Sequence, residues 1–241
     1  MPRFFLSEPP VGDQATLTGE DAAHISRSLR MTVGEALTLC DGRGTDYESE
    51  ITGITAQSVS VHITAAHPSI GEPDVRVVLY QGLPKGDKME WIVQKAVELG
   101  VAEVVPFAAA RSISRPDGAS AGKKVARWQK IADEAAGQSH RGTLPKVGAL
   151  ISFSEALRAA AACERILFCY EGGGEALRTI LQEKPKSIAV FIGPEGGFAP
   201  EEVAAAEAAG AVRISLGTRI LRTETAPLAA LSVIMFATGN L

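Results

Sequence analysis

A glycine-rich turn that carries a carboxylate is the most informative short stretch of this sequence. Residues 189–198 read AVFIGPEGGF, so an apolar run leads into a turn in which Gly193 precedes Glu195 and the pair Gly196 and Gly197 follows it. Glycine-rich turns between a strand and a helix often cradle phosphates with backbone N–H groups. This turn lacks the Lys-Ser/Thr pair of a P-loop and the G-x-G-x-x-G spacing, and the Glu195 carboxylate would repel a phosphate. The stretch is therefore either a tight turn shaped by Pro194 or one wall of a site for a neutral or cationic ligand.

Apolar and amphipathic segments after residue 75 predict the elements that position this turn. Apolar runs typical of strands cover 75–83, 102–107, 165–171, 187–193 and 212–217, and runs typical of helices cover 88–100, 123–139, 174–183, 200–210 and 226–239. Strands that are apolar throughout and alternate with helices indicate a parallel sheet covered on both faces. The sequence therefore predicts an α/β domain over 75–241.

Three irregular loops follow strands of this predicted sheet. They read CYEGGG at 169–174, GPEGG at 193–197 and LGTRILRTETA at 216–226. Ligands of open parallel sheets bind at the carboxyl ends of the strands, where such loops meet. This placement favours a ligand site over a turn without function.

The first 70 residues have a different pattern and predict a small β-rich domain. Short alternating apolar runs, such as the one with Leu37 and Leu39, are separated by Gly and Asp, as in the hairpins of a barrel. A short helix is expected within 19–31. The segment 66–74 contains two prolines and one glycine and is the expected linker.

Composition and the rare residue types narrow the class of protein. The chain has 241 residues, of which 46% are hydrophobic and 22% charged, and its formal net charge is −4. This composition is globular and argues against a general binder of polyanions. The three cysteines lack C-x-x-C spacing and the four histidines lack metal-ligand spacing, so we expect neither disulfides nor a metal. We find no secretory signal and no apolar run of membrane-spanning length, and we expect a cytoplasmic protein.

Positive charge is concentrated in one segment despite the negative total. From Arg111 to Lys146, eight basic residues stand against three acidic ones. Such a cluster is either a solvated helix face or a footprint for the phosphates of a nucleic acid. The arginines that could extend a footprint are Arg27, Arg30, Arg213, Arg219 and Arg222.

Several motifs in a fixed order resemble those of one family. FIGPEGGF and LGTRILRTETA are accompanied by MPRFF, HISRSLRMTVGE, KGDKMEWIVQKAVELGV and RWQKIADEAAGQSHRGTLP. In this combination the chain resembles the bacterial 16S ribosomal RNA uridine N3-methyltransferases of the SPOUT superfamily, the RsmE family. The resemblance covers nearly the whole chain.

The resemblance implies a fold, a cofactor and a homodimer that the patterns alone do not show. The implied fold is an N-terminal PUA-like, RNA-binding β-barrel over 1–70 and a C-terminal SPOUT α/β domain with a trefoil knot over 75–241. The implied cofactor is S-adenosyl-L-methionine, whose cationic sulfonium is compatible with Glu195. The cofactor-binding residues carried over from the motifs are Tyr170, Glu171, Gly193, Pro194, Glu195, Gly196, Gly197, Leu216, Gly217, Ile220, Leu221 and Arg222.

The implied partner is 16S ribosomal RNA in the small ribosomal subunit. The expected RNA contacts are Arg3, Arg27, Arg30 and Arg141. The chain departs from the family at 137–142, which reads GQSHRG where the family usually reads EQSGRN. His140 in this segment is either a substrate contact or a solvent-exposed loop residue.

The chemistry implied by the family requires an anionic nitrogen on the substrate. The N3–H of uridine is about as weakly acidic as a tyrosine hydroxyl, with a pKa near 10. An enzyme must therefore remove the proton with a base or stabilise the anion through its two carbonyl oxygens. We expect Arg222 to stabilise the anion and Glu224 to serve as base or to orient Arg222. Alternatively, Glu224 is a negative charge that favours the start of the last helix.

Two other functions remain open from the sequence. The chain could be a SPOUT methyltransferase for another RNA position, such as a ribose 2′-oxygen or a tRNA base. It could also be a non-catalytic RNA-binding assembly factor, although the intact GPEGG and LRTETA motifs count against this.

Overall fold

We describe the protein from a computed structural model that covers residues 1–241. The chain divides into two compact units, which we call unit 1 (1–72 and 136–144) and unit 2 (73–135 and 145–241). The break after Glu72 falls within the expected linker. The segment 136–144 differs from expectation, because the sequence placed it in the C-terminal domain. It joins unit 1, where the Glu72 carboxylate accepts hydrogen bonds from the N–H groups of Gly142 and Thr143 at 2.9 and 3.0 Å.

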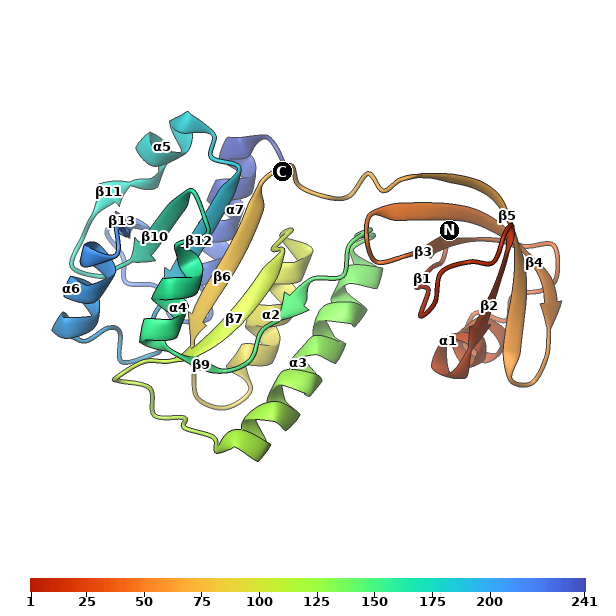
Figure 1. Cartoon of the computed structure of the whole chain (residues 1–241), viewed down its shortest axis with the longest axis horizontal. Coiled ribbons are helices and arrows are strands. Elements are labelled where there is room, and N and C mark those ends of the chain that lie inside the picture. The colour runs from red at the N-terminus through yellow and green to blue at the C-terminus, as the bar shows by residue number, and fades with distance from the viewer. The chain divides into compact units, whose positions relative to one another are not determined.

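Unit 1 is built on a curled five-stranded sheet in the order β1-β3-β4-β5-β2 (Figure 1). β1 pairs with β3 in parallel and all other neighbours are antiparallel. Leu37, Leu39 and Val61, which alternate with polar residues, are at most 1% exposed and fill the core. The β-rich domain expected from this alternation is thus confirmed. The strands are Arg3–Phe5 (β1), Gln14–Thr18 (β2), Ala36–Cys40 (β3), Thr45–Ile54 (β4) and Ser58–Pro68 (β5).

The one helical segment within residues 1–72 lies where the sequence predicts it. Helix α1 (Gly19–Ala23) continues into a π-helical turn, η1 (His24–Ser28). Ile25 is fully buried in the core of unit 1, which leaves Arg27 and Arg30 exposed. Arg30 has a left-handed backbone with φ of 53°, which ends the helical segment.

Unit 2 is built on an entirely parallel sheet in the order β11-β13-β10-β12-β6-β7-β8, with β9 also paired to β7. Six consecutive residues of β6 and five of β12 are buried, which shows that both faces of the sheet are covered. The parallel sheet predicted from the apolar runs is confirmed. Its strands are Arg76–Gly82 (β6), Glu103–Ala108 (β7), Lys146–Val147 (β8), Ile151–Ser152 (β9), Arg165–Cys169 (β10), Glu175–Ala176 (β11), Ser187–Ile192 (β12) and Val212–Ser215 (β13).

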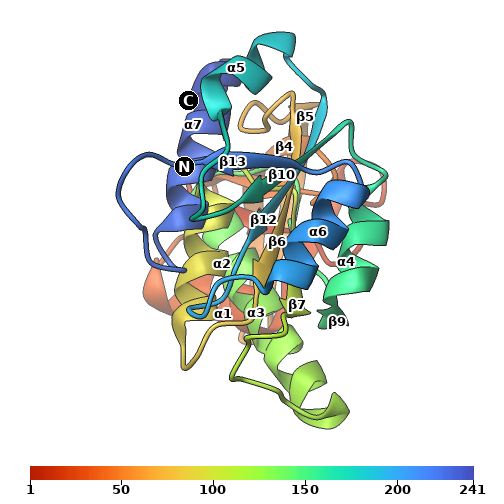
Figure 2. The same cartoon turned by 90° about the vertical axis from the view of Figure 1, so that its left-hand side faces the viewer.

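Helices lie on both sides of this sheet, and Figure 2 shows α4 and α6 on one side and α2 and α7 on the other. The helices are Lys88–Glu98 (α2), Gly118–Gln138 (α3), Phe153–Ala160 (α4), Leu177–Ile180 (α5) with the 3₁₀ turn Leu181–Glu183 (η2), Pro200–Ala208 (α6) and Ala226–Thr238 (α7). Helix α4 was not predicted from the sequence, and α5 is shorter than the helix predicted over 174–183. Glu175 and Ala176 pair with β13 instead of starting a helix. No helix combines the length and the apolar character that a bilayer crossing requires.

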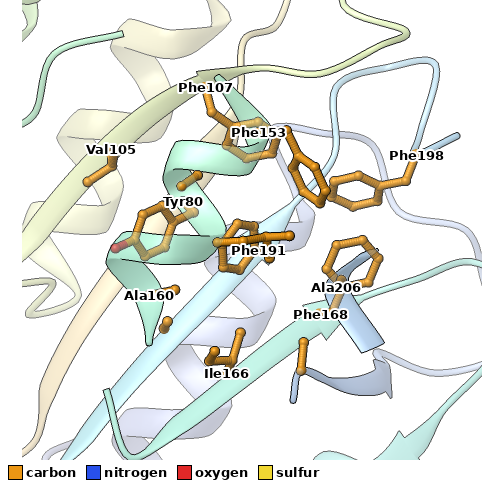
Figure 3. Close-up of a cluster of buried hydrophobic side chains, with 14 of the residues drawn as sticks. Tyr80, Val105, Phe107, Phe153, Ala160, Ile166, Phe168, Phe191, Phe198 and Ala206 are labelled. Carbon is orange, nitrogen blue, oxygen red and sulfur yellow. The ribbon is translucent and has the colours of Figure 1, made fainter. Parts of the chain in front are cut away.

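An aromatic cluster forms the core of unit 2 on one face of the sheet (Figure 3). Tyr80 of β6 and Phe191 of β12 stack with ring centroids 4.6 Å apart. Phe168 of β10 lies against Phe198, with centroids 4.1 Å apart. Phe198 directly follows the GPEGG turn, so this packing fixes the turn to the sheet.

Candidate functional site

The loops after β10, β12 and β13 line one cavity of about 380 Å³ in unit 2. The three strands are neighbours in the order β13-β10-β12, so their loops emerge side by side at one edge of the sheet (Figure 2). The volume lies within the range of about 300–1,000 Å³ that is usual for small-molecule sites. The pocket predicted at this edge is therefore present, and Lys88 from the start of α2 adds a fourth side to it.

The GPEGG turn lies directly against the end of β6. A Cβ atom added to Gly82 would be 2.5 Å from Cδ and 2.7 Å from N of Pro194. Only glycine therefore allows this approach of the two chain segments. Gly197 has a φ of 65°, and its N–H donates to the Pro194 carbonyl at 2.9 Å, which closes the turn. Gly82 thus allows the close packing of β6 against the turn, and Gly197 gives the turn its shape.

Glu195 is held by a neighbouring loop of the same unit. Its Oε1 accepts hydrogen bonds from the Lys85 backbone N–H at 3.1 Å and from the Lys88 ammonium at 2.9 Å. Burial raises the pKa of Glu195, but these hydrogen bonds outweigh it and hold the pKa below its usual value. The hydrogen bond to Glu195 in turn raises the pKa of Lys88. Glu195 is therefore ionised at neutral pH, and Lys88 balances its charge.

Gly196 differs from the other glycines of the turn, because it does not line the cavity. A Cβ atom at this position would meet Cβ of Arg111 at 3.0 Å and the Arg111 carbonyl at 3.2 Å. The Arg111 guanidinium also donates to the Gly196 carbonyl at 3.1 Å. The side of Gly196 that a larger residue would fill therefore faces the loop after β7. The structure brings Gly193, Pro194, Glu195 and Gly197 to the cavity, but not Gly196.

A buried chain of hydrogen bonds joins the GPEGG turn to the loop before α7. Gln81 Nε2 donates to Thr223 Oγ1 at 3.1 Å, and the Thr223 hydroxyl donates to the Gly193 carbonyl at 2.7 Å. Gln81 is fully buried, and its Oε1 has no hydrogen-bond partner. The end of β6 thus connects two walls of the cavity.

The loop after β10 supplies the next wall, as expected for Tyr170 and Glu171. The Tyr170 N–H donates to the Ile214 carbonyl at 3.2 Å, which ties this loop to β13. A Cβ atom on Gly172 would lie 2.4 Å from the Tyr170 ring, so the Gly172 backbone packs directly against that ring. Glu171 Oε1 lies 3.5 Å from the position that a Cβ on Gly197 would take, which places it beside the turn.

The segment 216–225, which we call the 216–225 loop, supplies the remaining wall. The predicted residues Leu216, Gly217, Ile220, Leu221 and Arg222 all line the cavity. The Ile220 side chain is 81% exposed despite its apolar character, and Arg222 is exposed as well. No backbone hydrogen bond joins 218–221 to another segment. Peptide groups of this loop are therefore available to a ligand.

Glu224 is placed at the cavity and is also ion-paired. Its Oε2 lies 3.4 Å from the Lys88 ammonium but accepts no hydrogen bond. The Arg222 carbonyl accepts hydrogen bonds from the N–H groups of Thr225 and Ala226, both at 2.9 Å, and so caps the start of α7. Both candidate catalytic residues therefore lie at the same edge of the cavity, immediately before a helix.

The four expected RNA contacts divide into two exposed and two buried residues. Arg27 and Arg30 are exposed on unit 1. Arg3 forms a salt bridge with Asp46, and Arg141 forms one with Glu72 at 2.7 Å. The side chains of Arg3 and Arg141 are only 7% and 4% exposed. They hold unit 1 together and do not offer their guanidinium groups to RNA, which corrects the expectation.

His140 and the basic segment can also be placed. His140 is exposed in unit 1 with a φ of 59°, outside the cavity, as expected for a loop residue. In the basic segment, Arg127 of α3 forms a 2.9 Å salt bridge with Glu90 of α2. Part of that positive charge is therefore used within the protein.

Lys88 and Gln81 were not predicted from the sequence, and neither was Thr223 of the 216–225 loop. Lys88 and Gln81 belong to the β6–α2 region, whose loop contains no glycine cluster like those of the other three. The order of the strands places β6 beside β12, and this order could not be read from periodicity. The KGDK stretch after a predicted strand is the only signal that could have pointed to Lys88.

Comparison with protein families places these features in a known class. Residues 71–235 match the family described as RNA methyltransferase domain, and residues 17–64 match the RNA methyltransferase PUA domain. The PUA match lies within unit 1, and the methyltransferase match covers most of unit 2 together with the 136–144 segment of unit 1. The chain therefore has the domain composition of a PUA-containing RNA methyltransferase.

Full-length relatives and solved structures specify the family. The chain is 38% identical to ribosomal RNA small subunit methyltransferase E of Bacillus subtilis, over 99% of this chain and 97% of that protein. It is 31% identical to the protein of the same name from Mycobacterium tuberculosis, over 96% and 90% of the two chains. The chain belongs to the ribosomal RNA small subunit methyltransferase E family.

Two similar solved structures contain a cofactor. The methyltransferase E of Neisseria gonorrhoeae, bound to S-adenosyl methionine, has a TM-score of 0.88 at 34% identity and covers 98% of this chain and 97% of its own. A putative methyltransferase from Legionella pneumophila, in complex with SAM, has a TM-score of 0.87 at 32% identity and covers the same shares. The two-domain fold implied by the motifs, with a PUA-like N-terminal domain and an α/β methyltransferase domain, is thereby confirmed.

Proposed function

We propose that this protein transfers a methyl group from S-adenosyl-L-methionine to N3 of a uridine in the 16S ribosomal RNA of the small ribosomal subunit. The observation that carries the proposal is the cavity at the carboxyl ends of β10, β12 and β13, in a chain that matches small subunit methyltransferase E over nearly its full length. A protein with this function acts on ribosomes, so we place it in the cytoplasm.

The residues of the cavity fit a cofactor that has a cationic centre and no phosphate. The walls contain the GPEGG turn and the 216–225 loop, and the peptide groups of 218–221 make no backbone hydrogen bond within the protein. Glu171 lies at the wall that Gly197 forms, where its carboxylate favours a positive charge. When bound, the cofactor supplies an electrophilic methyl group. The trefoil knot around this site stays a prediction from the family.

The cavity also supports the chemistry at uridine. Only about one N3 in a thousand is ionised at neutral pH, since its pKa is near 10. The Arg222 side chain is exposed at the cavity and could meet negative charge that develops on the uracil oxygens. Glu224 is paired with Lys88, and we retain it as the candidate base or as the residue that orients Arg222.

We further propose that the protein is a homodimer. Along α7, Val233 is 42% and Phe236 is 73% exposed, although the helix is apolar on all sides. Exposed apolar residues in such a helix are typical of a protein interface. Light scattering across micromolar concentrations tests this, with a mass of two chains expected and the mass of one chain, 25.3 kDa, contradicting it.

RNA binding is assigned to the exposed arginines of unit 1. Arg27 and Arg30 lie on the helical segment that ends in the left-handed Arg30 backbone. The double variant Arg27→Ala/Arg30→Ala should weaken binding to small subunits. It should also reduce the slope of the logarithm of the binding constant against the logarithm of the salt concentration, by about one for each lost phosphate contact. An unchanged salt dependence would show that this face is only solvated.

The test of the proposed function is methyl transfer with radiolabelled S-adenosyl-L-methionine to purified small subunits, large subunits and tRNA from a strain without the gene. We expect label in the small subunit alone. Transfer to tRNA would support a different RNA target, and cofactor binding without transfer to any RNA would support a non-catalytic factor.

A further inference from the structure

Lys88 occupies a position that joins three parts of the site. It is the first residue of α2, after the loop that follows β6. Its ammonium lies 2.9 Å from Glu195 Oε1 in the GPEGG turn and 3.4 Å from Glu224 Oε2 in the 216–225 loop. The Lys88 side chain is 32% exposed and lines the cavity. One cation therefore stands between two carboxylates from two different walls.

The two carboxylates depend on this cation. Glu195 also accepts a hydrogen bond from the Lys85 N–H. Glu224 Oε2 is buried and accepts no hydrogen bond, so Lys88 is the positive charge that compensates it. Without Lys88, the two carboxylates would face each other across the edge of the cavity, and the buried Oε2 of Glu224 would have no cation beside it.

Helix stability does not account for a lysine at this position. A positive charge in the first turn of a helix is disfavoured by the helix dipole, which prefers cations at the other end. Lys95 in the last turn of α2 has the favourable placement and pairs with Glu98 at 2.7 Å. The contacts of Lys88 are therefore made to the cavity walls, at a cost to its own helix.

We propose that Lys88 is a positioning residue, which fixes the 216–225 loop against the GPEGG turn and thereby sets the place of Arg222 relative to the methyl donor. This inference rests on the proposed function. Lys88 acts through Glu195 and Glu224, because its ammonium lies between their carboxylates and attracts both. Reacting groups must be aligned closely, and a displacement of about 1 Å can reduce a rate by about 100-fold.

The first test compares Lys88→Met with the control Lys95→Met. Lys95 is a matched residue, because it lies on the same helix, is ion-paired and has a similar exposure of 26%. Single-turnover methyl transfer to small subunits, with saturating cofactor, should fall about 10- to 100-fold in Lys88→Met and stay within about two-fold of wild type in the control. Lys88→Arg keeps the charge in a bulkier planar group and should recover part of the rate.

The second test separates positioning from any general loss of structure. The double variant Lys88→Met/Glu224→Gln removes the uncompensated carboxylate along with the cation, so it should hold the 216–225 loop in place better than Lys88→Met alone. This comparison is made by amide exchange and not by rate, because Glu224 is also the candidate base. Hydrogen–deuterium exchange of the protein without cofactor gives a readout that does not depend on activity. Lys88→Met should speed exchange of the hydrogen-bonded Thr225 and Ala226 amides, with 188–192 in β12 of the same unit unchanged, whereas unfolding of unit 2 would speed both.

The outcomes distinguish this inference from the proposed function. If wild type and Lys95→Met transfer no methyl to any RNA, the proposed function fails and the exchange experiment still tests the placement of Lys88. If wild type is active and Lys88→Met matches it in rate and in exchange, the positioning role is overturned. Equal amide exchange near the start of α7 in Lys88→Met and Lys88→Met/Glu224→Gln would also overturn it, since no charge would then need compensation.

Discussion

The substitution Gly82→Ala tests the packing that places the GPEGG turn. The added Cβ would lie 2.5 Å from Cδ and 2.7 Å from N of Pro194. The optimal separation of two non-bonded carbon atoms is about 3.5–4.0 Å, so the turn must move by about 1 Å. The atoms in the way belong to backbone and a proline ring, which cannot rotate aside. We therefore expect the upper end of the usual cost of overpacking, about 3 kcal/mol.

This cost converts into a measurable loss of thermal stability. A domain of about 150–250 residues loses about 2–4 °C of Tm for each kcal/mol, which gives a decrease of about 6–12 °C for Gly82→Ala. The control is Gly122→Ala in α3, where an added Cβ meets nothing within 4 Å. It should raise Tm slightly, because alanine favours a helix by about 1 kcal/mol over glycine.

Cofactor binding gives the second readout. Because the displaced turn lines the cavity, calorimetry should show weaker binding of S-adenosyl-L-methionine to Gly82→Ala than to the control. A Gly82→Ala protein with the Tm and the cofactor affinity of wild type would refute the close approach of β6 and the turn.

Three further outcomes follow from single side chains. Thr223→Val should lower the free energy of unfolding by about 1–3 kcal/mol in urea titrations, because it leaves Gln81 and the Gly193 carbonyl short of a buried partner; an unchanged midpoint would contradict the buried chain. Arg222→Ala should reduce the single-turnover rate about 100- to 1000-fold with little change in cofactor affinity, and Arg222→Lys should recover part of it; a native rate with weakened cofactor binding would make Arg222 a cofactor contact instead. Asp46→Asn should cost about 3 kcal/mol at neutral pH, because the buried Arg3 guanidinium loses its anion. Burial raises the pKa of Asp46, but the hydrogen bonds from Arg3 and Ser69 outweigh burial and hold the pKa below 3.8. The extra free energy of unfolding of wild type over Asp46→Asn should therefore be full above about pH 3.8 and disappear as the pH falls through the lower pKa of the folded state. A difference in unfolding free energy that does not vary with pH would refute this ionisation.

Periodicity predicted the sheet of unit 2 because its strands are apolar throughout. The buried runs of β6 and β12 could be read directly, and so could the loops that follow β10, β12 and β13. The short strand β11 could not, because Glu175 and Ala176 are both exposed and pair only through their backbone with β13. Local patterns carry no information on such edge pairing.

The parts of the site that glycine-rich loops form could be predicted from the sequence. The parts that form where distant segments of the chain meet could not. The three glycine-containing loops were found, whereas Lys88 depends on the adjacency of β6 and β12. Arg3 and Arg141 were misjudged because their charge suggested exposure. Their partners, Asp46 and Glu72, are far away in the sequence, and only the fold brings these ion pairs together.

The central claim is methylation at uridine N3, and nucleoside mass spectrometry tests it most directly. Small ribosomal subunits from a strain that lacks the gene would be incubated with the purified protein and S-adenosyl-L-methionine, and their 16S ribosomal RNA digested to nucleosides. The account predicts that N3-methyluridine is absent before incubation and appears after it, and that Arg222→Ala produces far less in the same time. Methyl groups found only on a ribose 2′-oxygen or on another base, or no new methylated nucleoside with the wild-type protein, would contradict it.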